Sequence, residues 1–390
     1  MRTVRSVGVY AFVGVVAIAA IEVRSNESGG GGGEKPPTYH VNVIEWATAE
    51  YYGNDLNEHG QASLTGPSPV EQFGLIGRRW DERGGFLAVG PDSSMTTGIN
   101  NRGDVTVVMM GAYASSTPWR AGLWTARDGL TELGTLGGLR TFADAVNDRG
   151  EVVGWSEDAA GDRYAFLWTK EQGMRSLEDL PGGSANGWGI DITNNGMVVG
   201  TSYGADGQFG FRWTEKGGMQ SLGDLPGGRA ESAAKAANER GQIVGVGHIE
   251  ANYSRAVLWD EEGRMRDLGV LRPGDISHAD DINKDGVVVG WSAPYPGGTS
   301  LAFVPFVWTE EHGMLDLHTL LDEASAEWQL AGFQMGGIND RGQILLSGML
   351  DGQYARVLLT PINPEPATLL TCVSGALLLL RRQGVRRARS

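Results

Sequence analysis

Short runs of apolar residues, each closed by a turn rich in glycine, recur along most of the chain. One pass reads Val152-Val153-Gly154, then Ala165-Phe166-Leu167-Trp168, then Met174-Arg175-Ser176-Leu177. The first run is apolar at successive positions, which predicts a strand buried on both faces, whereas the third alternates as a half-exposed strand should. No long stretch has a helical period, and only residues 317–324 could line one short helical face. We therefore expect an all-β protein.

Two polar turns set the period of the pattern. Asn147-Asp148-Arg149-Gly150 suits a type I turn that ends in a glycine with positive φ, and Leu180-Pro181-Gly182-Gly183 has the Pro and Gly of a type II turn. The phrase recurs about every 45 residues, in the range of propeller blades. Its first position is filled seven times, by Asn57, Asn100, Asn147, Thr193, Asn238, Asn283 and Asn339.

These repeats predict a β-propeller over residues 39–361. We expect seven blades, with six or eight as alternatives. The last pass stops after residues 356–359, one strand short, while residues 39–44 form an alternating strand with no blade of its own. The N-terminal strand is therefore expected to close the ring, which would also remove the open sheet edges that favour aggregation.

Charge and composition narrow the partners and cofactors. The chain has 47 acidic and 32 basic residues and a formal net charge of −15, so it repels phosphate backbones and we expect no nucleic-acid partner. The six His residues show no metal-ligand spacing. Calcium is the one alternative to a protein without cofactors, because residues 281–286 match the first half of a calcium loop. The twelfth position of that loop is Ser292, however, where a Glu is expected.

Three acidic residues are the candidates for chemistry. Asp55, Asp191 and Asp281 each lie two residues before the repeat position, so a ring would gather them near one face as channel carboxylates. A glycosidase would need two carboxyls roughly 5–10 Å apart with different pKa values. If the three side chains instead cap turns separately, a catalytic role is disfavoured.

Serine and tryptophan motifs allow a structural interpretation and a functional one. Residues 200–204 match the G-x-S-x-G nucleophile elbow, but Ser202 holds the repeat position filled elsewhere by Ser156 and Ser292, which favours a structural role. Trp residues at a regular strand position are expected to be buried between blades rather than to form a sugar platform. That series is Trp80, Trp124, Trp168, Trp213, Trp259 and Trp308; Trp155, Trp188 and Trp291 lie outside it and are the better candidates for exposed stacking.

Both ends of the chain have the composition of targeting segments. Arg2 and Arg5 precede the uncharged residues 7–21, and Ala17, Ala19 and Ala20 form a small-residue cleavage region. This order predicts a secretory signal peptide over residues 1–20, and a Gly/Pro-rich linker follows over residues 21–38. At the other end, residues 362–390 contain Pro364-Glu365-Pro366, a mostly apolar stretch and an Arg-rich terminus.

The three parts of this tail, in this order, resemble the PEP-CTERM sorting signal of Gram-negative bacteria. The resemblance implies that the tail holds the exported protein transiently in the inner membrane until an exosortase removes it. The Arg-rich end would stay in the cytoplasm while the body is outside. The only cysteine, Cys372, lies in this tail, so the mature body would have no disulfide. A simple tail anchor is the alternative.

The repeats themselves resemble the HAF repeat, named for a His-Ala-Phe triplet. The triplet stands here as Tyr164-Ala165-Phe166 and Leu301-Ala302-Phe303. The resemblance implies an extracellular propeller and brings no activity. Since no catalytic set is evident, we expect a non-catalytic cell-surface or biofilm-matrix protein that binds an extracellular polysaccharide or a surface protein and is handled by the secretion machinery. The alternative is a propeller enzyme, a glycosidase, lyase or lactonase, acting on extracellular polysaccharide.

Overall fold

The computed structural model describes residues 36–47, 53–68, 74–110, 118–228, 230–250, 253–295, 302–332 and 335–362. The predicted signal peptide, including Ala17, Ala19 and Ala20, lies outside these residues. So does the predicted sorting tail from residue 363 on, with Pro364, Glu365 and Pro366. Among the described residues, no helix has the length and apolar character needed to cross a membrane.

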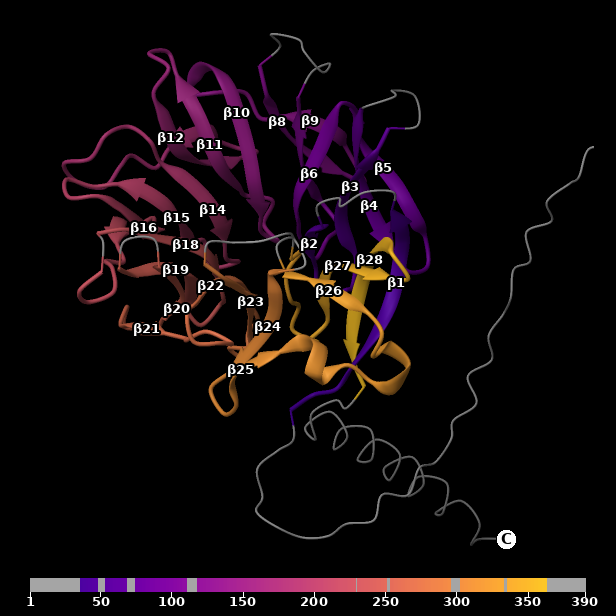
Figure 1. Cartoon of the computed structure of the whole chain (residues 1–390). Helices are drawn as coiled ribbons and strands as arrows, with labels where there is room; N and C mark the ends of the chain where they lie inside the picture. Colours follow the sequence, from indigo (N-terminus) through magenta and orange to yellow (C-terminus); the bar gives the residue numbers. More distant parts are fainter. Residues whose placement is uncertain are drawn as a thin grey trace, which may run out of the picture. The chain divides into compact units, whose positions relative to one another are not determined.

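The described residues form seven antiparallel sheets of four strands each, which follow one another round a ring (Figure 1). The predicted seven-bladed propeller is therefore confirmed. Blade 1 contains β2 (Gly53–Leu56), β3 (Ala62–Pro67), β4 (Leu75–Asp81) and β5 (Gly85–Asp92); blade 2 contains β6 (Ser94–Ile99), β7 (Val105–Met109), β8 (Arg120–Thr125) and β9 (Gly129–Glu132). Blade 3 contains β10 (Gly137–Val146), β11 (Val152–Asp158), β12 (Arg163–Thr169) and β13 (Gly173–Ser176); blade 4 contains β14 (Trp188–Ile192), β15 (Val198–Tyr203), β16 (Gln208–Thr214) and β17 (Gly218–Ser221).

The remaining blades repeat the same order until the last one. Blade 5 contains β18 (Ser232–Ala237), β19 (Ile243–Glu250), β20 (Tyr253–Trp259) and β21 (Met265–Asp267); blade 6 contains β22 (Asp275–Ile282), β23 (Val288–Pro294), β24 (Val304–Thr309) and β25 (Gly313–Asp316). Blade 7 combines β26 (Gln329–Ala331), β27 (Ile344–Leu350) and β28 (Gln353–Pro361) with β1 (Tyr39–Ala47) from the other end of the chain.

The N-terminal strand closes the ring, as its pattern predicted. β1 pairs antiparallel with β28, with Tyr39 opposite Pro361 and Val41 opposite Leu359. Glu45 on this strand reaches Arg78 Nη2 of blade 1 at 2.9 Å and lies 3.5 Å from Arg356 Nε of blade 7. Closure thus combines a full strand pairing with a partly buried ionic contact to the next blade.

The two predicted turns adopt the predicted geometry. In the Asn turn, Gly150 has a φ of +79° and donates its N–H to Asn147 O at 2.9 Å. In the Pro-Gly turn, Gly182 has a φ of +77° and Gly183 N–H donates to Leu180 O at 3.1 Å. A side chain other than that of glycine would be strained at both positive-φ positions, which explains the glycine at each.

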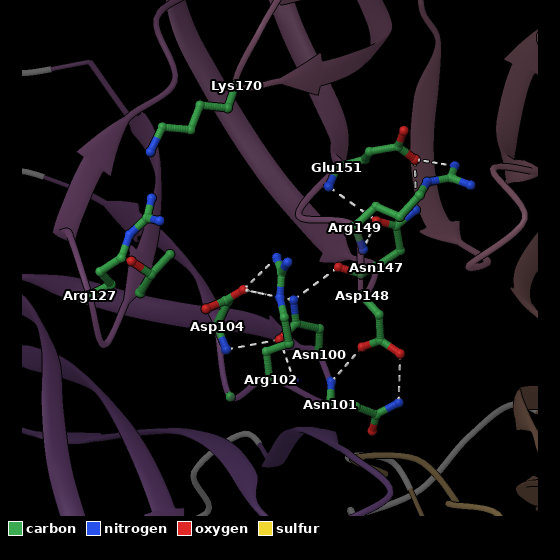
Figure 2. Close-up of polar contacts among 12 residues, drawn as sticks. Asn100, Asn101, Arg102, Asp104, Arg127, Asn147, Asp148, Arg149, Glu151 and Lys170 are labelled. Carbon is green, nitrogen blue, oxygen red and sulfur yellow. Dashed lines mark hydrogen bonds and ion pairs between the residues drawn. The ribbon is translucent and has the colours of Figure 1, made fainter.

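The Asn turns also bind one another from blade to blade. Asn100 Nδ2 donates to the main-chain oxygen of Asn147 at 2.9 Å, and its Oδ1 accepts the N–H groups of Arg102 and Asp104 within its own turn (Figure 2). The inter-blade bond recurs six times round the ring. It is missing only between Thr193 and Asn238, because the threonine side chain has no amide group to donate. The bonds run from Asn57 to Asn100, Asn100 to Asn147, Asn147 to Thr193, Asn238 to Asn283, Asn283 to Asn339, and Asn339 to Asn57.

A second belt runs beside the first, one residue later in each turn. Figure 2 shows Asn101 N–H and Nδ2 donating to the two carboxylate oxygens of Asp148 in the next blade, at 2.8 and 2.9 Å. Equivalent main-chain bonds join five other neighbouring pairs of turns. The pair without one is Glu239 and Lys284, because a lysine side chain has no acceptor. We call this side of the propeller the Asn-turn face.

The repeated Trp residues pack between blades. Trp168, Trp213, Trp259 and Trp308 are buried, as predicted, while Trp124 is only half-buried and has the Arg79 guanidinium 5.4 Å from its ring centroid. The second strands are buried on both faces, as their continuous apolar runs predicted.

The predicted helical face in the longest repeat proves to be two short 3₁₀ segments, η2 (Leu317–Leu320) and η3 (Glu323–Ser325). Leu317 and Leu320 bury their side chains in the core of blade 7. The apolar spacing was therefore informative, although neither segment is long enough to form an α-helix.

Candidate functional site

The first strand of each blade lies round the propeller axis. First strands contact the first strands of neighbouring blades, from β2 through β6, β10, β14 and β18 to β22. Each Asn turn joins a first strand to a second strand, so the first strands end at the Asn-turn face and begin at the opposite face, here called the entry face. Most first strands contain a bulge just before the turn, as between Ala279 and Asp281. A bulge redirects side chains, and here it affects the acidic positions.

The three predicted carboxylates lie together beneath the Asn-turn face. A methyl group added to Gly337 would lie 2.6 Å from Asp281 Oδ2 and 3.7 Å from Asp55 Oδ1, so these two carboxyls flank one point. The charges of Asp55 and Asp191 both raise the pKa of Asp281. The repeat position therefore brings the three side chains into electrostatic contact, as the sequence predicted.

Each of these carboxylates is nevertheless engaged by the main chain. Asp281 Oδ1 accepts the N–H of Ile282 at 2.8 Å, and its Oδ2 accepts the N–H of Ile338 in the next blade at 2.7 Å. Asp55 and Asp191 repeat this arrangement, each with the residue that follows it and with a residue of the next blade. The set clamps blade 1 to blade 2, blade 4 to blade 5 and blade 6 to blade 7.

Burial dominates the titration of this set. It raises the pKa of Asp55 to about 7 and that of Asp191 to about 6, against the lowering effect of the two main-chain hydrogen bonds that each accepts. The pKa of Asp281 is also raised, first by burial and then by the neighbouring carboxylates. Different values on neighbouring carboxyls are what acid–base chemistry requires, but the occupied oxygens favour a structural role.

A second charged set was not identified from the sequence. Asp144, Lys235 and Asp280 occupy the position three residues before the repeat position, in blades 3, 5 and 6. The positive charge of Lys235 lowers the pKa of both aspartates, which places the three side chains near one another across the axis. Burial outweighs this effect and raises the pKa of Asp144 to about 8 and that of Asp280 to about 7.

The second set differs from the first in its free hydrogen-bonding capacity. Asp144 Oδ2 accepts the indole N–H of Trp188 at 2.8 Å. Apart from that bond, no residue in the described ranges lies within hydrogen-bond or ion-pair distance of the Asp144 carboxyl, the Lys235 amine or the Asp280 carboxyl. All three groups are half-buried. Their polar atoms are therefore available to a bound molecule.

Aromatic rings gather beside this charged set. Phe142 stacks on Trp155 with the centroids 6.2 Å apart, and Trp188 meets both rings edge-on at 6.3 and 6.1 Å. Trp119, from the entry-face end of blade 2, lies 6.0 Å from Phe142. The Arg163 guanidinium covers Trp155 at 4.1 Å. We call Trp119, Phe142, Trp155 and Trp188 the aromatic cluster.

Only one of the three Trp residues predicted to be exposed is so. Trp188 has 39% of its surface exposed, whereas Trp155 and Trp291 are buried, with 3% and 8%. Trp291 stacks on His278 at 4.2 Å, and Phe142 and Arg163 enclose Trp155. Being outside the repeat position was thus no guide to exposure. Trp119, with 42% of its surface exposed, was not recognised from the sequence.

The serine motif is structural. Ser202 is fully buried on β15, and its Oγ accepts the N–H of Leu180 at 3.3 Å. Ser156 and Ser292 bind the main chain in the same way, through Leu136 and Leu271. The repeated serine thus holds the loop before the first strand in blades 3, 4 and 6, and no strand-to-helix elbow is present there.

The calcium-like loop is an Asn turn. Asn283 Oδ1 accepts the N–H groups of Asp285 and Val287, and Asp281 binds main-chain N–H groups with both oxygens. Among the described residues, no group of three or more His, Cys, Asp or Glu side chains has the geometry to hold a metal ion.

Two histidines lie on or beside the entry half of the axis. His278 shares the less buried side of β22 with Asp280 and bonds Ser254 Oγ through Nε2 at 2.8 Å. Burial, with the positive charge of Lys235 and the neighbouring His248, lowers the pKa of His278 to about 3, so its ring is neutral near pH 7. A separate open pocket is lined by Tyr203, Asp206, Gly207, Gln208, Ala230 and Glu231.

A repeat alignment could have revealed most of the missed residues. At the position five residues before the repeat position, the blades have Met95, Phe142, Trp188, Ala233 and His278, and at the position three residues before it they have Thr97, Asp144, Ile190, Lys235 and Asp280. Both positions vary from blade to blade, while the residue between them stays small: Thr96, Ala143, Gly189, Ala234 and Ala279. Such variation means that the fold does not prescribe the side chain.

No protein-family model matches the chain, and no curated protein matches it. Solved structures are similar in fold. A puromycin hydrolase S511A mutant has a TM-score of 0.51 and 13% identity over 79% of this chain and 51% of its own. A puromycin-hydrolysing peptidase of Mycobacterium tuberculosis has 0.51 and 11% over 83% and 56%. Streptogramin B lyase has 0.49 and 14% over 83% and 98%. The chain thus spans about half the length of the two hydrolases, and the likeness shows a propeller fold.

Proposed function

We propose that this protein is an exported, non-catalytic binding propeller of the cell surface or extracellular matrix, matured by an exosortase. The observation that carries the proposal is the state of Asp55, Asp191 and Asp281. A general acid or a nucleophile must present a free oxygen to its substrate. In each of these carboxylates, both oxygens accept hydrogen bonds from main-chain N–H groups of two blades. The three side chains therefore stabilise the ring.

The path of the chain supports presentation of the entry face. Tyr39, where β1 starts, pairs with Pro361, where β28 ends, and Ile362 N–H donates to Thr38 O at 2.9 Å. A methyl group on Gly342, in an Asn turn, would lie 3.5 Å from Pro361 Cγ. Both ends of the body therefore leave from the Asn-turn face. A body held at the membrane by a sorting tail would direct its entry face outward.

A propeller enzyme acting on extracellular polysaccharide is the second candidate. It is favoured by the different pKa values of Asp55 and Asp191, about 7 and about 6, with Asp281 close by. Incubation of the protein with polysaccharides and measurement of new reducing or unsaturated ends separates the two functions. Turnover abolished by Asp191→Asn would establish the enzyme and refute the non-catalytic proposal.

Mass spectrometry of the protein recovered from the culture medium tests export and maturation. The expected product lacks residues 1–20 and every peptide beyond the Pro364-Glu365-Pro366 region, including Cys372. A variant with alanine at Pro364, Glu365 and Pro366 is the matched control and should stay with the membrane fraction. Recovery of the Cys372 peptide from shed wild-type protein would refute sorting and favour a simple tail anchor.

A further inference from the structure

We propose that the aromatic cluster and the Asp144–Lys235–Asp280 set form one binding site, centred on the first strands of the blades, for a neutral saccharide. The inference rests on the proposed binding function and specifies its ligand class. It depends on three features of the described residues: exposed rings held in fixed positions, charged groups without protein partners, and the combination of donors and acceptors that those groups offer.

The exposed ring of Trp188 is held in place before any ligand binds. Its indole N–H donates to Asp144 Oδ2 at 2.8 Å, and its edge contacts Phe142 and Trp155. Trp155 is itself fixed between Phe142 and the guanidinium of Arg163. A ring fixed in this way loses little conformational entropy on binding, which favours affinity. Trp119, on the other side of Phe142, adds a second exposed indole.

The fold does not account for these rings. The equivalent position is Met95 in blade 2 and Ala233 in blade 5, and both blades form the same sheet. A large aromatic side chain that stays 39% exposed forgoes much of the burial that would stabilise the fold. The cluster spans blades 2, 3 and 4, so it forms one local surface on the ring.

The charged set beside the cluster is incompletely satisfied by the protein. Half-buried charged groups without partners destabilise a fold, and they are found where a ligand supplies the missing contacts. Asp144 has one oxygen bonded to Trp188 and one available, while the Lys235 amine and the Asp280 carboxyl bind no residue in the described ranges. The bond from Trp188 joins the charged set to the aromatic cluster.

The chemistry of the two groups of residues points to a polyhydroxylated, uncharged ligand. A lysine amine donates hydrogen bonds and a carboxyl oxygen accepts them, whereas a sugar hydroxyl does both. The apolar C–H face of a pyranose matches an indole face. Polyanions are disfavoured by the net charge of −15, and a simple cation is disfavoured by the positive charge of Lys235, which acts on both aspartates.

The test measures binding to the exported protein. Neutral hexasaccharides (maltohexaose, cellohexaose, mannohexaose and galactan fragments), an alginate hexamer and spermidine are screened by isothermal titration calorimetry. At least one neutral oligosaccharide should bind. Trp188→Ala and Asp144→Asn should each weaken that binding at least tenfold. Trp46→Ala is the matched control, because Trp46 is 52% exposed but lies on β1 of blade 7, and it should leave the affinity unchanged.

The outcomes separate the two proposals. Asp144→Asn preserves the shape of the side chain and gives a second measurement if Trp188→Ala proves unstable. Saccharide binding that neither variant weakens overturns the assigned site. Binding of only alginate or spermidine overturns the ligand class. Both results remain compatible with a binding function. Cleavage of the bound oligosaccharide overturns the non-catalytic function. No binding to any neutral oligosaccharide overturns the saccharide inference alone.

Discussion

Two regions of the propeller, the Asn-turn face and the first strands that lead to it, use polar residues in opposite ways. On the Asn-turn face, nearly every blade repeats the same bonds. Asn57 donates a hydrogen bond to the turn of blade 2, and Asn100 donates the equivalent bond to the turn of blade 3. On the first strands, three and five residues before the repeat position, the residues differ from blade to blade, and Asp144, Lys235 and Asp280 keep unbonded polar atoms. The repeated turn residues satisfy their own hydrogen bonds, whereas the variable residues of the first strands do not.

This difference separates structural from functional carboxylates. Asp55, Asp191 and Asp281 share a repeat position. The hydrogen bonds that they accept from the next blade explain that regularity. Asp144 and Asp280 occupy a position whose residue type changes from blade to blade, so the repeat does not identify them. In a protein built of repeats, a residue shared by several blades therefore points first to the fold, and a polar residue at a variable axial position points to a ligand.

The largest expected effect comes from the periodic core. Trp213→Ala removes a buried ring that packs with Leu167 of blade 3 and Val198 of blade 4, and it should lower the free energy of unfolding by about 3–5 kcal/mol. Urea unfolding followed by circular dichroism measures the loss. Trp119→Ala, at an exposed aperiodic position, is the control and should cost about 0.5 kcal/mol or less. Equal losses of stability in the two variants would contradict the distinction between repeated structural positions and variable exposed ones.

A pH effect of intermediate size is expected from the axial carboxyls. Asp55, Asp280 and Asp144 have folded-state pKa values of about 7, about 7 and about 8, above the value of 3.8 expected in the unfolded chain. Between pH 6.5 and 8.5 the folded protein therefore binds more protons than the unfolded chain, and stability falls as the pH rises. The loss should be on the order of 3 kcal/mol.

Urea titrations at pH 6.5, 7.5 and 8.5 test this sign. His278, whose pKa is lowered to about 3, destabilises the fold only below about pH 6.5 and so does not disturb the chosen window. Asp144→Asn should remove the largest single part of the slope, because its pKa is the highest of the three. Stability that does not change between pH 6.5 and 8.5 would show that these groups are ionised throughout.

The smallest effect is expected from one link of the Asn belt. Asn100→Ala removes the bond to Asn147 O and the three side-chain bonds that hold its own turn, and it should cost about 1–3 kcal/mol. Thr193→Asn is the reciprocal variant, because it supplies the missing amide between blades 4 and 5, and it should stabilise the ring by up to about 1 kcal/mol. Loss of stability on completing the belt would show that the bonds do not act as a ring.

Local chemistry explains why much of the fold could be predicted. A continuous apolar run can be satisfied only between two layers, and an Asn-x-x-Gly phrase favours one turn geometry, so strands and turns were readable from neighbouring residues. The count of strands at the two ends then predicted the pairing of β1 with β28. Four of the six Trp residues in the series are buried as expected, whereas Trp80 and Trp124 are half-buried.

The sequence by itself determined the repeat, the seven sheets, the closure and the convergence of Asp55, Asp191 and Asp281, because each follows from a spacing that recurs along the chain. Only the tertiary structure decided which polar atoms are satisfied and which rings are exposed. Trp155 is buried and Trp188 is not, although neither holds the repeated position, because Phe142 and Arg163 lie against one ring and solvent against the other. Such contacts join residues of different strands, and no spacing along one strand encodes them.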